Sequence, residues 1–422
     1  MKPSSSASEP PPGGSGLFDA ISRRGPVAHL VGDAAYLRAM LDTEAALARA
    51  EARTGLIPAE HAVAITEACA AGRFDIAEIG RAAEAPGNHV EPLVRRLRDA
   101  VGGAAADYLH AGATSQDILD TATMLVARQA LSAVVADVDA AGDAAARLAA
   151  DHRHTVMAGR TLLQQALPTT FGAKAAGWLS GLDDGAEVLQ SVRDGRLAVQ
   201  LGGGAGTLAS LHPHGPELVA FLAEELGLPA PALPWHTNRT RIAELAGALG
   251  VAAAAVGKPA RDVTLLAQTE VGEVREVAPG RGRSSTMPQK RNPVAAVATL
   301  ANTASAPGLV AAVLAAAAGH EHERAAGAWH AEWHPLRELF VAVGSAAAWL
   351  ADCLAHLEVD GARMRANLDL PGGALEGAEA QRRATPALAG VDLDKVDPAA
   401  YLGATDVFVD AALRRHAGRR GR

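Results

Sequence analysis

Residues 280–293 read Gly-Arg-Gly-Arg-Ser-Ser-Thr-Met-Pro-Gln-Lys-Arg-Asn-Pro, and they separate two long Ala-rich runs. The runs have the composition of helices, whereas the glycines and prolines exclude a regular helix from the segment between them. Two serines, one lysine and one asparagine stand within residues 284–292. A glycine-containing loop that carries hydroxyls and a cation is typical of a lid over a negatively charged ligand. This segment is therefore the first candidate for a functional site.

The composition around this loop predicts a helical protein. The chain has 422 residues, of which 49% are hydrophobic and only 3% aromatic. Ala, Leu and Val supply much of the non-aromatic hydrophobic part. Such Ala- and Leu-rich segments with charges at intervals favour helix over sheet. The net charge is −8, and the only basic run is the short tail at 414–422. This charge argues against nucleic acid as a main partner.

The cysteines and the chain's first residues indicate the cellular compartment of the protein. Two cysteines, Cys69 and Cys353, make no disulfide framework, so a reducing cytoplasm is expected. Residues 1–16 are rich in Ser, Pro and Gly without an apolar core, and we predict a disordered tail and no signal peptide. The longest apolar run, 309–318, is too short to span a bilayer. The sequence thus predicts a soluble cytoplasmic protein without a membrane partner.

Apolar residues recur at helical spacing through most of the chain. Amphipathic helices are predicted over 32–55 and 58–71. Thr114 and Asp117 fit a capping box for a helix that runs to about residue 150, a length of about 50 Å. Four more long helices are predicted over 168–201, 239–277, 293–319 and 335–357. Five long helices with short joints predict an all-α bundle, and no strand alternation competes with it.

Several motifs have a plain structural interpretation beside a functional one. The glycines of 202–206 lack the preceding strand of a phosphate-binding loop, so a helix break is favoured. His320, His330 and His334 suggest a metal, but the glutamate spacing is wrong for a zinc-protease helix, so a charge-paired helix end is favoured. Asn88 lies in a breaker-rich joint, where both a ligand contact and a surface turn are open.

Two polar segments precede long predicted helices, where free backbone N–H groups favour anions. One spans 159–168 and contains Gln164 and Gln165, and the other is Thr114-Ser115-Gln116. Each segment alone is explained by helix capping. The third polar cluster is the loop at 280–293, which we call the serine–lysine loop. All three clusters stand at helix ends, and we predict that they converge on one site.

These three segments, in this order, resemble the fumarase/aspartase superfamily, whose signature loop reads Gly-Ser-Ser-x-x-Pro-x-Lys-x-Asn. The supporting stretches are 112–122, 159–172, 235–238 and 320–333. The likeness extends from about residue 32 to residue 373. Within the superfamily it is strongest to the bacterial 3-carboxy-cis,cis-muconate cycloisomerases.

The resemblance implies an architecture and an assembly. It implies a three-domain all-α protomer with a central five-helix bundle at 112–357, an N-terminal helical domain at 17–111 and a shortened C-terminal domain at 358–422. It also implies a homotetramer in which each site draws residues from three subunits. The expected substrate is a small di- or tricarboxylate, and no metal ion or organic cofactor is implied.

The resemblance also assigns roles to residues. Ser284 matches the proton-transfer serine, and Lys290 and Asn292 match substrate-binding positions of the loop. Arg324 is interpreted as a carboxylate clamp or as a salt bridge within the bundle. The remaining positions expected to bind substrate are Asn88, Thr114, Ser115, Gln116, Gln164 and Gln165.

Superfamily members remove a proton next to a carboxylate and expel a group from the β carbon, through an aci-carboxylate intermediate. Preplaced N–H groups, hydroxyls, Asn and Lys stabilise its charge, and the alkoxide of Ser284 needs such donors. Amine-releasing relatives such as adenylosuccinate lyase carry a histidine where this chain has Leu162. A departing carboxylate has a pKa near 4 and needs no proton, so Leu162 disfavours amine elimination and is compatible with lactone closure or with another good anionic leaving group. The resemblance implies lactone closure, in aromatic (protocatechuate, β-ketoadipate pathway) catabolism.

Rival interpretations and departures from the family pattern remain. One rival is a fumarate-releasing lyase of nitrosuccinate type or, less favoured, of adenylosuccinate or argininosuccinate type. Another is an inactive structural relative, as among the lens crystallins. Arg283 replaces the first glycine of the signature and is expected to stiffen the loop or to contact an anion. Pro259 is expected to kink a long helix, and the region after Gly373 is short for the family.

Overall fold

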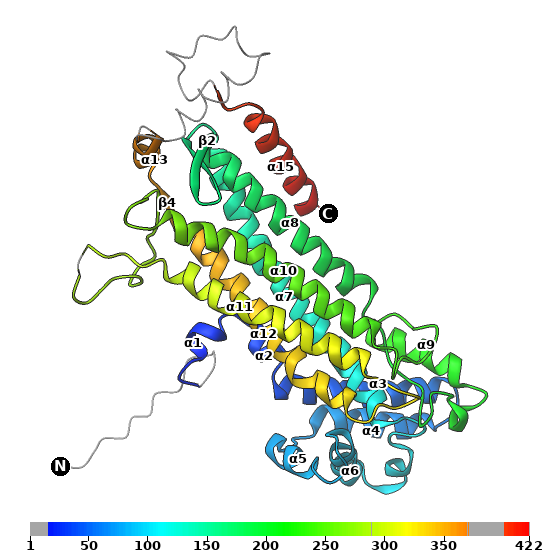
Figure 1. Cartoon of the computed structure of the whole chain (residues 1–422). Helices are drawn as coiled ribbons and strands as arrows, with labels where there is room; N and C mark the ends of the chain where they lie inside the picture. Colours follow the sequence, from blue (N-terminus) through cyan, green and yellow to red (C-terminus); the bar gives the residue numbers. More distant parts are fainter. Residues whose placement is uncertain (1–15, 288, 369, 371–400, 422) are drawn as a thin grey trace, which may run out of the picture. The chain divides into compact units, whose positions relative to one another are not determined.

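The computed structural model describes residues 16–287, 289–368, 370 and 401–421 (Figure 1). The described residues belong to two compact units. The first unit lies within Met1–Ala133, Leu189–Leu249 and Pro307–Gly344, and the second within Val134–Val188, Gly250–Ala306 and Ser345–Arg422. The predicted tail at 1–16 lies almost wholly outside the described residues. The three-domain division remains a prediction.

The fold is all-α with five long helices, as predicted. Among the described residues, five helices have 25 or more residues. They are α7 (Ser115–Asp151), α8 (Phe171–Gly195), α10 (Thr240–Leu266), α11 (Val294–Ala318) and α12 (Ala328–Ala355). Each of them contributes residues to both units. Long apolar helices of this kind are stable because their faces pack on one another rather than through propensity alone.

Small residues allow the long helices of the second unit to approach closely. A Cβ built on Gly185 of α8 would lie 3.1 Å from the Cβ of Ala255 in α10, and one on Gly257 would lie 3.4 Å from Oγ1 of Thr303 in α11. Trp178 of α8 is buried and donates from Nε1 to Asp262 of α10 at 2.7 Å. The Ala- and Gly-rich composition therefore serves close helix packing.

The first unit adds shorter helices to its share of the long ones. They are α1 (Asp19–Ser22), α2 (Val27–Leu30), α3 (Asp33–Arg53), α4 (Ala59–Ala71), α5 (Ile76–Ala82), α6 (Val90–Val101) and α9 (Gly215–Leu226), with 3-10 turns η1 (Gly103–Tyr108) and η2 (Ala209–Leu211). Leu47, Ile65, Leu93 and Leu97 are fully buried among them. Arg49 of α3 pairs with Glu225 of α9 at 2.7 Å.

The structure contains strands where none were predicted. β1 (Val156–Thr161) pairs with β2 (Gln164–Thr170), and β3 (Val274–Glu276) pairs with β4 (Leu357–Val359), both antiparallel. The sequence shows no strand alternation at these positions, and the two short strand pairs lie within a fold that is otherwise helical. The β1–β2 hairpin turns at two leucines instead of the usual Asn-Gly, and β3 and β4 are only three residues long, so neither sheet leaves a sequence signal.

Prolines and the hairpin explain the misplaced helix ends. The helix predicted from residue 168 begins at Phe171 because β2 occupies the residues before it, and α10 ends at Leu266 rather than at 277. Pro335 was taken as a helix start, yet it lies inside α12, which begins at Ala328. Pro259 likewise lies inside α10, which continues as one helix. The C-terminal helices are α13 (Gly361–Leu368) and α15 (Thr405–Arg420); residues 371–400, in the region predicted to be short, lie outside the described residues.

Four helices, α7, α10, α11 and α12, are long and apolar enough to cross a membrane by length and composition. The prediction against a membrane rested on uninterrupted apolar runs, which is a narrower criterion. In α7 and α12, 72% of the most apolar window is buried within the protein, whereas in α11 only 22% is buried. The apolar faces of α7 and α12 are thus used for internal packing, while α11 leaves most of its length uncovered.

Candidate active site

The serine–lysine loop belongs to the second unit and is closed at its base. Arg283 and Arg291 form an isolated antiparallel bridge, and the backbone N–H of Asn292 donates to Gly282 O at 2.8 Å. Gly282 has a φ of 78°, and a Cβ there would lie 2.6 Å from Asn292 O. Only glycine tolerates both conditions. Ser284 and Lys290 therefore lie on a loop whose two ends are held together.

Ionic groups anchor the loop to the helices beside it. The buried carboxylate of Glu276 accepts from the N–H groups of Ala295 and Ala296 at 3.0 and 2.9 Å, and so caps the first turn of α11. Before the loop, Arg281 pairs with Asp352 of α12. A carboxylate at a helix N-terminus is stabilised by free N–H groups and by the helix dipole. Both anchors fix where the loop leaves and rejoins the helices.

The hydroxyl of Ser284 accepts hydrogen bonds from the backbone of its own loop. Its Oγ lies 3.2 Å from Met287 N and 3.4 Å from Thr286 N, and the residue is half-buried. N–H groups that point at a hydroxyl oxygen stabilise the alkoxide when the proton leaves. Lys290 and Asn292 lie on the same loop, where Lys290 is exposed and Asn292 half-buried. The serine thus has the local donors that proton transfer requires.

The hairpin β1–β2 carries Gln164 and Gln165, so the polar segment precedes a long helix as predicted, but as a strand that leads into α8. Gln165 Nε2 donates to Asn367 O at 3.0 Å, whereas Gln164 is exposed. On the partner strand, Arg160 forms two hydrogen bonds with the fully buried Glu273, at 2.7 and 2.9 Å. These contacts hold the hairpin against β3 and α13.

The tip of this hairpin consists of Leu162 and Leu163. Their φ angles are 52° and 66°, a region that is unfavourable for leucine. Their exposed fractions are 96% and 72%. Two apolar side chains are thus presented to solvent on a strained turn.

In the first unit, Thr114, Ser115 and Gln116 begin α7 as predicted. The backbone N–H of Thr114 donates to Asp117 Oδ2 at 3.0 Å, which is one half of the expected capping box. Gln116 is 4% exposed, and its amide donates to His236 O at 2.8 Å and to Asp120 at 3.1 Å. The Gln116 side chain therefore supports the segment from within, while Thr114 and Ser115 are half-buried at its surface.

Asp117 organises this segment, and sequence reasoning gave it only a capping role. Its carboxylate also accepts from Gly202 N at 3.0 Å, Gly203 N at 2.9 Å and His236 Nε2 at 2.6 Å. The glycine cluster thus supplies two backbone donors to a buried carboxylate. Sequence reasoning missed the Asp117–His236 pair and the contact of Gly202 with Asp117. These two contacts join three segments that are far apart in the chain.

Arg324 and Asn88 contact the backbone in this unit. Arg324 donates to the carbonyls of Gly203 and Glu323, and burial lowers the pKa of its guanidinium. No ion pair of Arg324 occurs among the described residues, so the bundle salt bridge is not formed by them. Asn88 accepts from Val90 N and Glu91 N, both at 3.1 Å, and so caps α6.

The histidines near α12 pair with protein groups. His320 Nε2 lies 3.0 Å from Glu332, and His330 Nε2 lies 2.8 Å from Gly87 O. Within the described ranges, no three His, Cys, Asp or Glu side chains are arranged to hold a metal ion. The contact of His320 with Glu332 matches the favoured interpretation of a charge-paired helix end, whereas His330 contacts a backbone carbonyl.

The predicted site residues divide between the two units. Asn88, Thr114, Ser115, Gln116 and Arg324 belong to the first unit, and Gln164, Gln165, Ser284, Lys290 and Asn292 belong to the second. Within the first unit, Asp117 accepts hydrogen bonds from the N–H groups of Thr114 and Gly203, and Arg324 donates to the carbonyl of Gly203. Within the second, Ser284, Lys290 and Asn292 share one closed loop.

An all-α chain of long helices with a closed serine–lysine loop between two of them defines the class, a lyase of the fumarase/aspartase superfamily. The chain belongs to the family described as Lyase, whose model matches residues 18–308. The protein is therefore an enzyme of this superfamily.

Known relatives and structures agree on this class. The chain is 50% identical over 345 residues to 3-carboxy-cis,cis-muconate cycloisomerase of Bradyrhizobium diazoefficiens, covering 81% of this chain and 76% of the relative. It is 47% identical over 386 residues to nitrosuccinate lyase of Streptomyces davaonensis, covering 89% and 81%. The crystal structure of 3-carboxy-cis,cis-muconate lactonizing enzyme from Pseudomonas putida has a TM-score of 0.88 and 40% identity, covering 95% of this chain and 99% of that one.

Proposed function

We propose that the protein is a cycloisomerase that closes 3-carboxy-cis,cis-muconate to 4-carboxymuconolactone in aromatic (protocatechuate) catabolism. The observation that carries this proposal is its 50% identity to a relative of that name over most of both chains. The closed Ser284 loop supports it, because lactonisation needs a group that delivers a proton to carbon. The substrate would be a tricarboxylate anion.

In the proposed reaction, an oxygen of one substrate carboxylate forms a bond to an alkene carbon. Negative charge develops on the neighbouring carbon and spreads into its carboxylate as an aci-carboxylate. The Ser284 hydroxyl then gives its proton to that carbon, and the resulting alkoxide regains a proton from solvent. The N–H groups of Thr286 and Met287 lie at 3.4 and 3.2 Å from Oγ and stabilise the alkoxide between these steps.

The other predicted residues are proposed to hold the anionic substrate. Lys290 and Asn292 would bind carboxylates from the loop, Arg324 would act as a bidentate clamp, and Thr114 and Ser115 would offer hydroxyls at a helix start. The remaining proposed contacts come from Asn88, Gln116, Gln164 and Gln165. Because Gln116 and Asn88 already serve the protein's own backbone and side chains, their contribution is mainly to position their neighbours.

Leu162 supports a reaction without an amine leaving group. It is 96% exposed at the hairpin tip and has no group that could protonate a departing amine. In lactone closure the reacting oxygen belongs to a carboxylate with a pKa near 4, which needs no proton. The adenylosuccinate and argininosuccinate types are therefore disfavoured.

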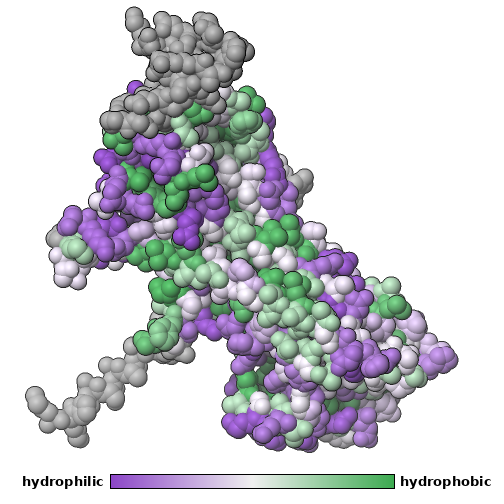
Figure 2. Space-filling view, viewed as in Figure 1, coloured by the Kyte–Doolittle hydropathy of each residue, from purple (hydrophilic) through white to green (hydrophobic). Residues whose placement is uncertain are grey.

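A homotetramer in the cytoplasm, with sites shared between three subunits, is part of the proposal. In α11, Val297 and Leu314 are 54% and 44% exposed, and the face drawn in Figure 2 shows hydrophobic side chains along this helix. Long apolar helices left uncovered in a protomer are expected at subunit interfaces. Light scattering of the purified protein measures the subunit number directly, and a monomer at working concentration would contradict this assembly.

A nitrosuccinate lyase is the second candidate, favoured by 47% identity to the Streptomyces davaonensis enzyme. Nitrite is also a good anionic leaving group, so Leu162 fits this reaction as well. Product analysis by proton NMR separates the two. The proposal predicts a lactone from 3-carboxymuconate, whereas fumarate and nitrite from nitrosuccinate, with 3-carboxymuconate left unchanged, would establish the second candidate.

A further inference from the structure

The carboxylate of Asp117, in the first turn of α7, is buried and is held by four N–H donors. Its Oδ1 accepts from Gly202 N at 3.0 Å and from His236 Nε2 at 2.6 Å. Its Oδ2 accepts from Thr114 N at 3.0 Å and from Gly203 N at 2.9 Å. Because a carboxylate can only accept, Nε2 of His236 carries the proton in this contact. Each oxygen therefore accepts two hydrogen bonds, and the carboxylate is fully engaged within the protein.

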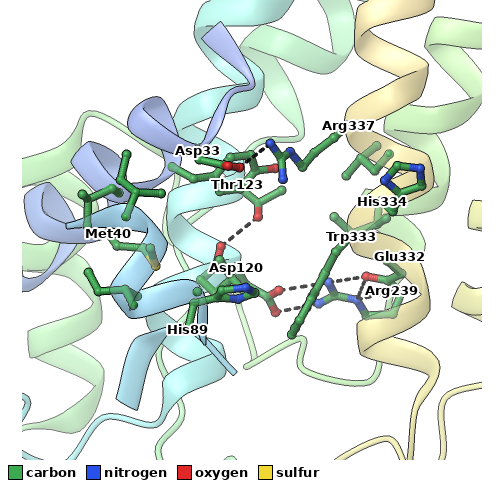
Figure 3. A pocket seen from close by; sticks show the side chains of 18 residues that line it. Asp33, Met40, His89, Asp120, Thr123, Arg239, Glu332, Trp333, His334 and Arg337 are labelled. Atoms are coloured by element: carbon green, nitrogen blue, oxygen red, sulfur yellow. Dashed lines mark hydrogen bonds and ion pairs between the residues drawn. The ribbon is translucent and has the colours of Figure 1, made fainter. Parts of the chain in front are cut away.

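Asp120, about one helical turn further along α7, is paired in a different way. Arg239 bonds Asp120 at 2.7 and 3.0 Å and Glu332 at 2.8 Å, and all three residues are buried. Figure 3 shows Arg239 between the two carboxylates. This group of ions joins α7 to α12, so the packing of the helices explains it. No Arg or Lys side chain of the described residues forms an ion pair with Asp117, which instead bonds the backbone of segments that carry proposed substrate contacts.

The first of these segments begins α7. Asp117 accepts from Thr114 N and so fixes the turn that carries the hydroxyls of Thr114 and Ser115. Ser115 lines a cavity of about 320 Å³, whose wall also includes Arg98 and His110. This volume lies within the range of small-molecule sites. There is therefore space for a ligand beside Ser115, two residues before the buried carboxylate that holds its segment.

The second segment connects Asp117 to Arg324 through Gly203. Gly203 donates its N–H to Asp117 and accepts at its carbonyl from the guanidinium of Arg324. It has a φ of 68°, and a Cβ there would lie 2.8 Å from Gly112 O, so only glycine allows this backbone path. Arg324 bonds one more carbonyl, that of Glu323, which leaves part of its N–H fork for a carboxylate. The position of this guanidinium thus depends on Asp117.

His236 holds the carboxylate of Asp117 in one orientation. The imidazole is 4% exposed, and a Cβ on Gly202 would lie 2.6 Å from its Cε1. The carbonyl of His236 accepts from the Gln116 amide at 2.8 Å, so its backbone is fixed as well. The ring therefore has little room to turn, and its N–H is directed at Asp117.

We infer that Asp117 is a positioning residue, which holds the Thr114–Ser115 segment and Arg324 where they bind the carboxylates of the substrate, and that His236 acts through Asp117. Asp117 does not contact the substrate itself, because it is buried and both of its oxygens are engaged. This role rests on the proposed function, which places Thr114, Ser115 and Arg324 at the substrate. It adds two residues of the first unit, outside the serine–lysine loop, to those that determine substrate affinity.

Asp117→Asn tests this role with almost no change in size. Whichever way the new amide turns, its NH₂ group faces two N–H donors in place of an acceptor, so two of the four hydrogen bonds are lost. We expect KM to rise by about tenfold or more and kcat to stay within about threefold of the parent, because the carboxylate contacts bind substrate and transition state alike. Ile65→Ala is the control, since it removes a fully buried side chain of α4 and lowers stability. Its KM should equal that of the parent.

Two variants of His236 test whether it acts through Asp117. His236→Gln places an amide N–H near the position of Nε2, whereas the shorter side chain of His236→Asn does not reach Asp117. The glutamine variant should recover most of the affinity, and the asparagine variant should match Asp117→Asn. The double variant Asp117→Asn/His236→Asn should have the KM of either single variant, because both changes break the same contact. Multiplied losses in the double variant would contradict the role of His236.

Calorimetric titration with tricarballylate, a saturated tricarboxylate, separates this role from the proposed reaction, because it measures binding without turnover. We expect Asp117→Asn, shown to be folded by circular dichroism, to bind this probe about tenfold or more weakly than the parent, and Ile65→Ala to bind it equally well. A parent that binds tricarballylate but leaves 3-carboxymuconate unchanged would contradict the proposed reaction and leave the role of Asp117 intact. A folded Asp117→Asn variant with the affinity and KM of the parent would overturn that role. A parent that binds no carboxylate would overturn both.

Discussion

The hydroxyl oxygen of Ser284 lies 3.2 Å from the backbone nitrogen of Met287, and this N–H donates to it. With the N–H of Thr286 at 3.4 Å, the loop places two dipoles where an alkoxide charge would form. Serine is a weak base at its ordinary pKa, so such donors are what proton transfer at this residue requires. This relationship depends on the fold of the loop and not on another side chain.

A proline at position 286 tests the backbone donors. Thr286→Pro removes one N–H that points at Ser284, whereas Thr286→Ala removes the side chain and keeps the N–H. We expect kcat to fall by about tenfold or more in the proline variant, with little change in KM, because the donor acts on developing charge. The alanine variant should stay close to the parent in steady-state assays. Equal losses in both variants would contradict the role of the backbone.

The charge of Lys290 is expected to act on substrate binding. Lys290→Met should raise KM for 3-carboxymuconate by about tenfold or more, because one anionic group of the substrate loses its cation. Lys290→Arg keeps the charge and should recover most of the affinity. Steady-state kinetics at low and high salt measure this effect, and a methionine variant with unchanged KM would remove Lys290 from the binding site.

The hairpin tip is expected to be a source of strain. Leu163 has a φ of 66°, where glycine is favoured and leucine costs about 1–2 kcal/mol. Leu163→Gly should therefore raise the free energy of unfolding by about 1 kcal/mol, whereas Leu163→Ala keeps the strain and should not. Denaturant unfolding at one protein concentration compares them. A less stable glycine variant would show that the exposed Leu163 side chain makes stabilising contacts in the assembled protein.

Glu51 is expected to make stability fall as pH rises. Burial, with help from the nearby Glu44, raises the pKa of its carboxyl from an ordinary 4.5 to about 9. Between these values the unfolded chain loses the proton and the folded chain keeps it, so stability decreases by at most about 1.4 kcal/mol per pH unit. Glu51→Gln should be more stable than the parent at pH 8, with a difference that shrinks towards pH 5. Parallel stability curves from pH 5 to 8 would contradict this.

The sequence could predict the bundle because its signals are local. Apolar residues repeat at helical spacing over long stretches, and the Thr114–Asp117 pattern places the start of α7 correctly. The β1–β2 hairpin could not be predicted, because Leu162 and Leu163 occupy turn positions that usually carry Asn and Gly. At Pro335 the helix start was misplaced for the opposite reason. Proline is a strong helix-breaking signal, yet α12 contains Pro335 within its length.

The candidate site could be predicted only in part. Ser284, Lys290 and Asn292 stand in one short motif, so residue type and spacing suffice to propose them as one group. Asp117 and His236 are 119 positions apart, and no local pattern relates them before the chain folds. The backbone donors to Ser284 are equally invisible, because every residue except proline carries an N–H and only the loop's conformation directs two of them to one oxygen.

The rate of 3-carboxymuconate turnover by the parent protein and by Ser284→Ala, followed by ultraviolet absorbance, tests the central claim most directly. We predict that the parent converts the substrate to the lactone and that Ser284→Ala loses on the order of 10²–10⁴-fold in kcat while remaining folded. A parent protein that leaves 3-carboxymuconate unchanged would contradict the proposed reaction. A Ser284→Ala variant with unchanged turnover would contradict the assignment of the proton to Ser284.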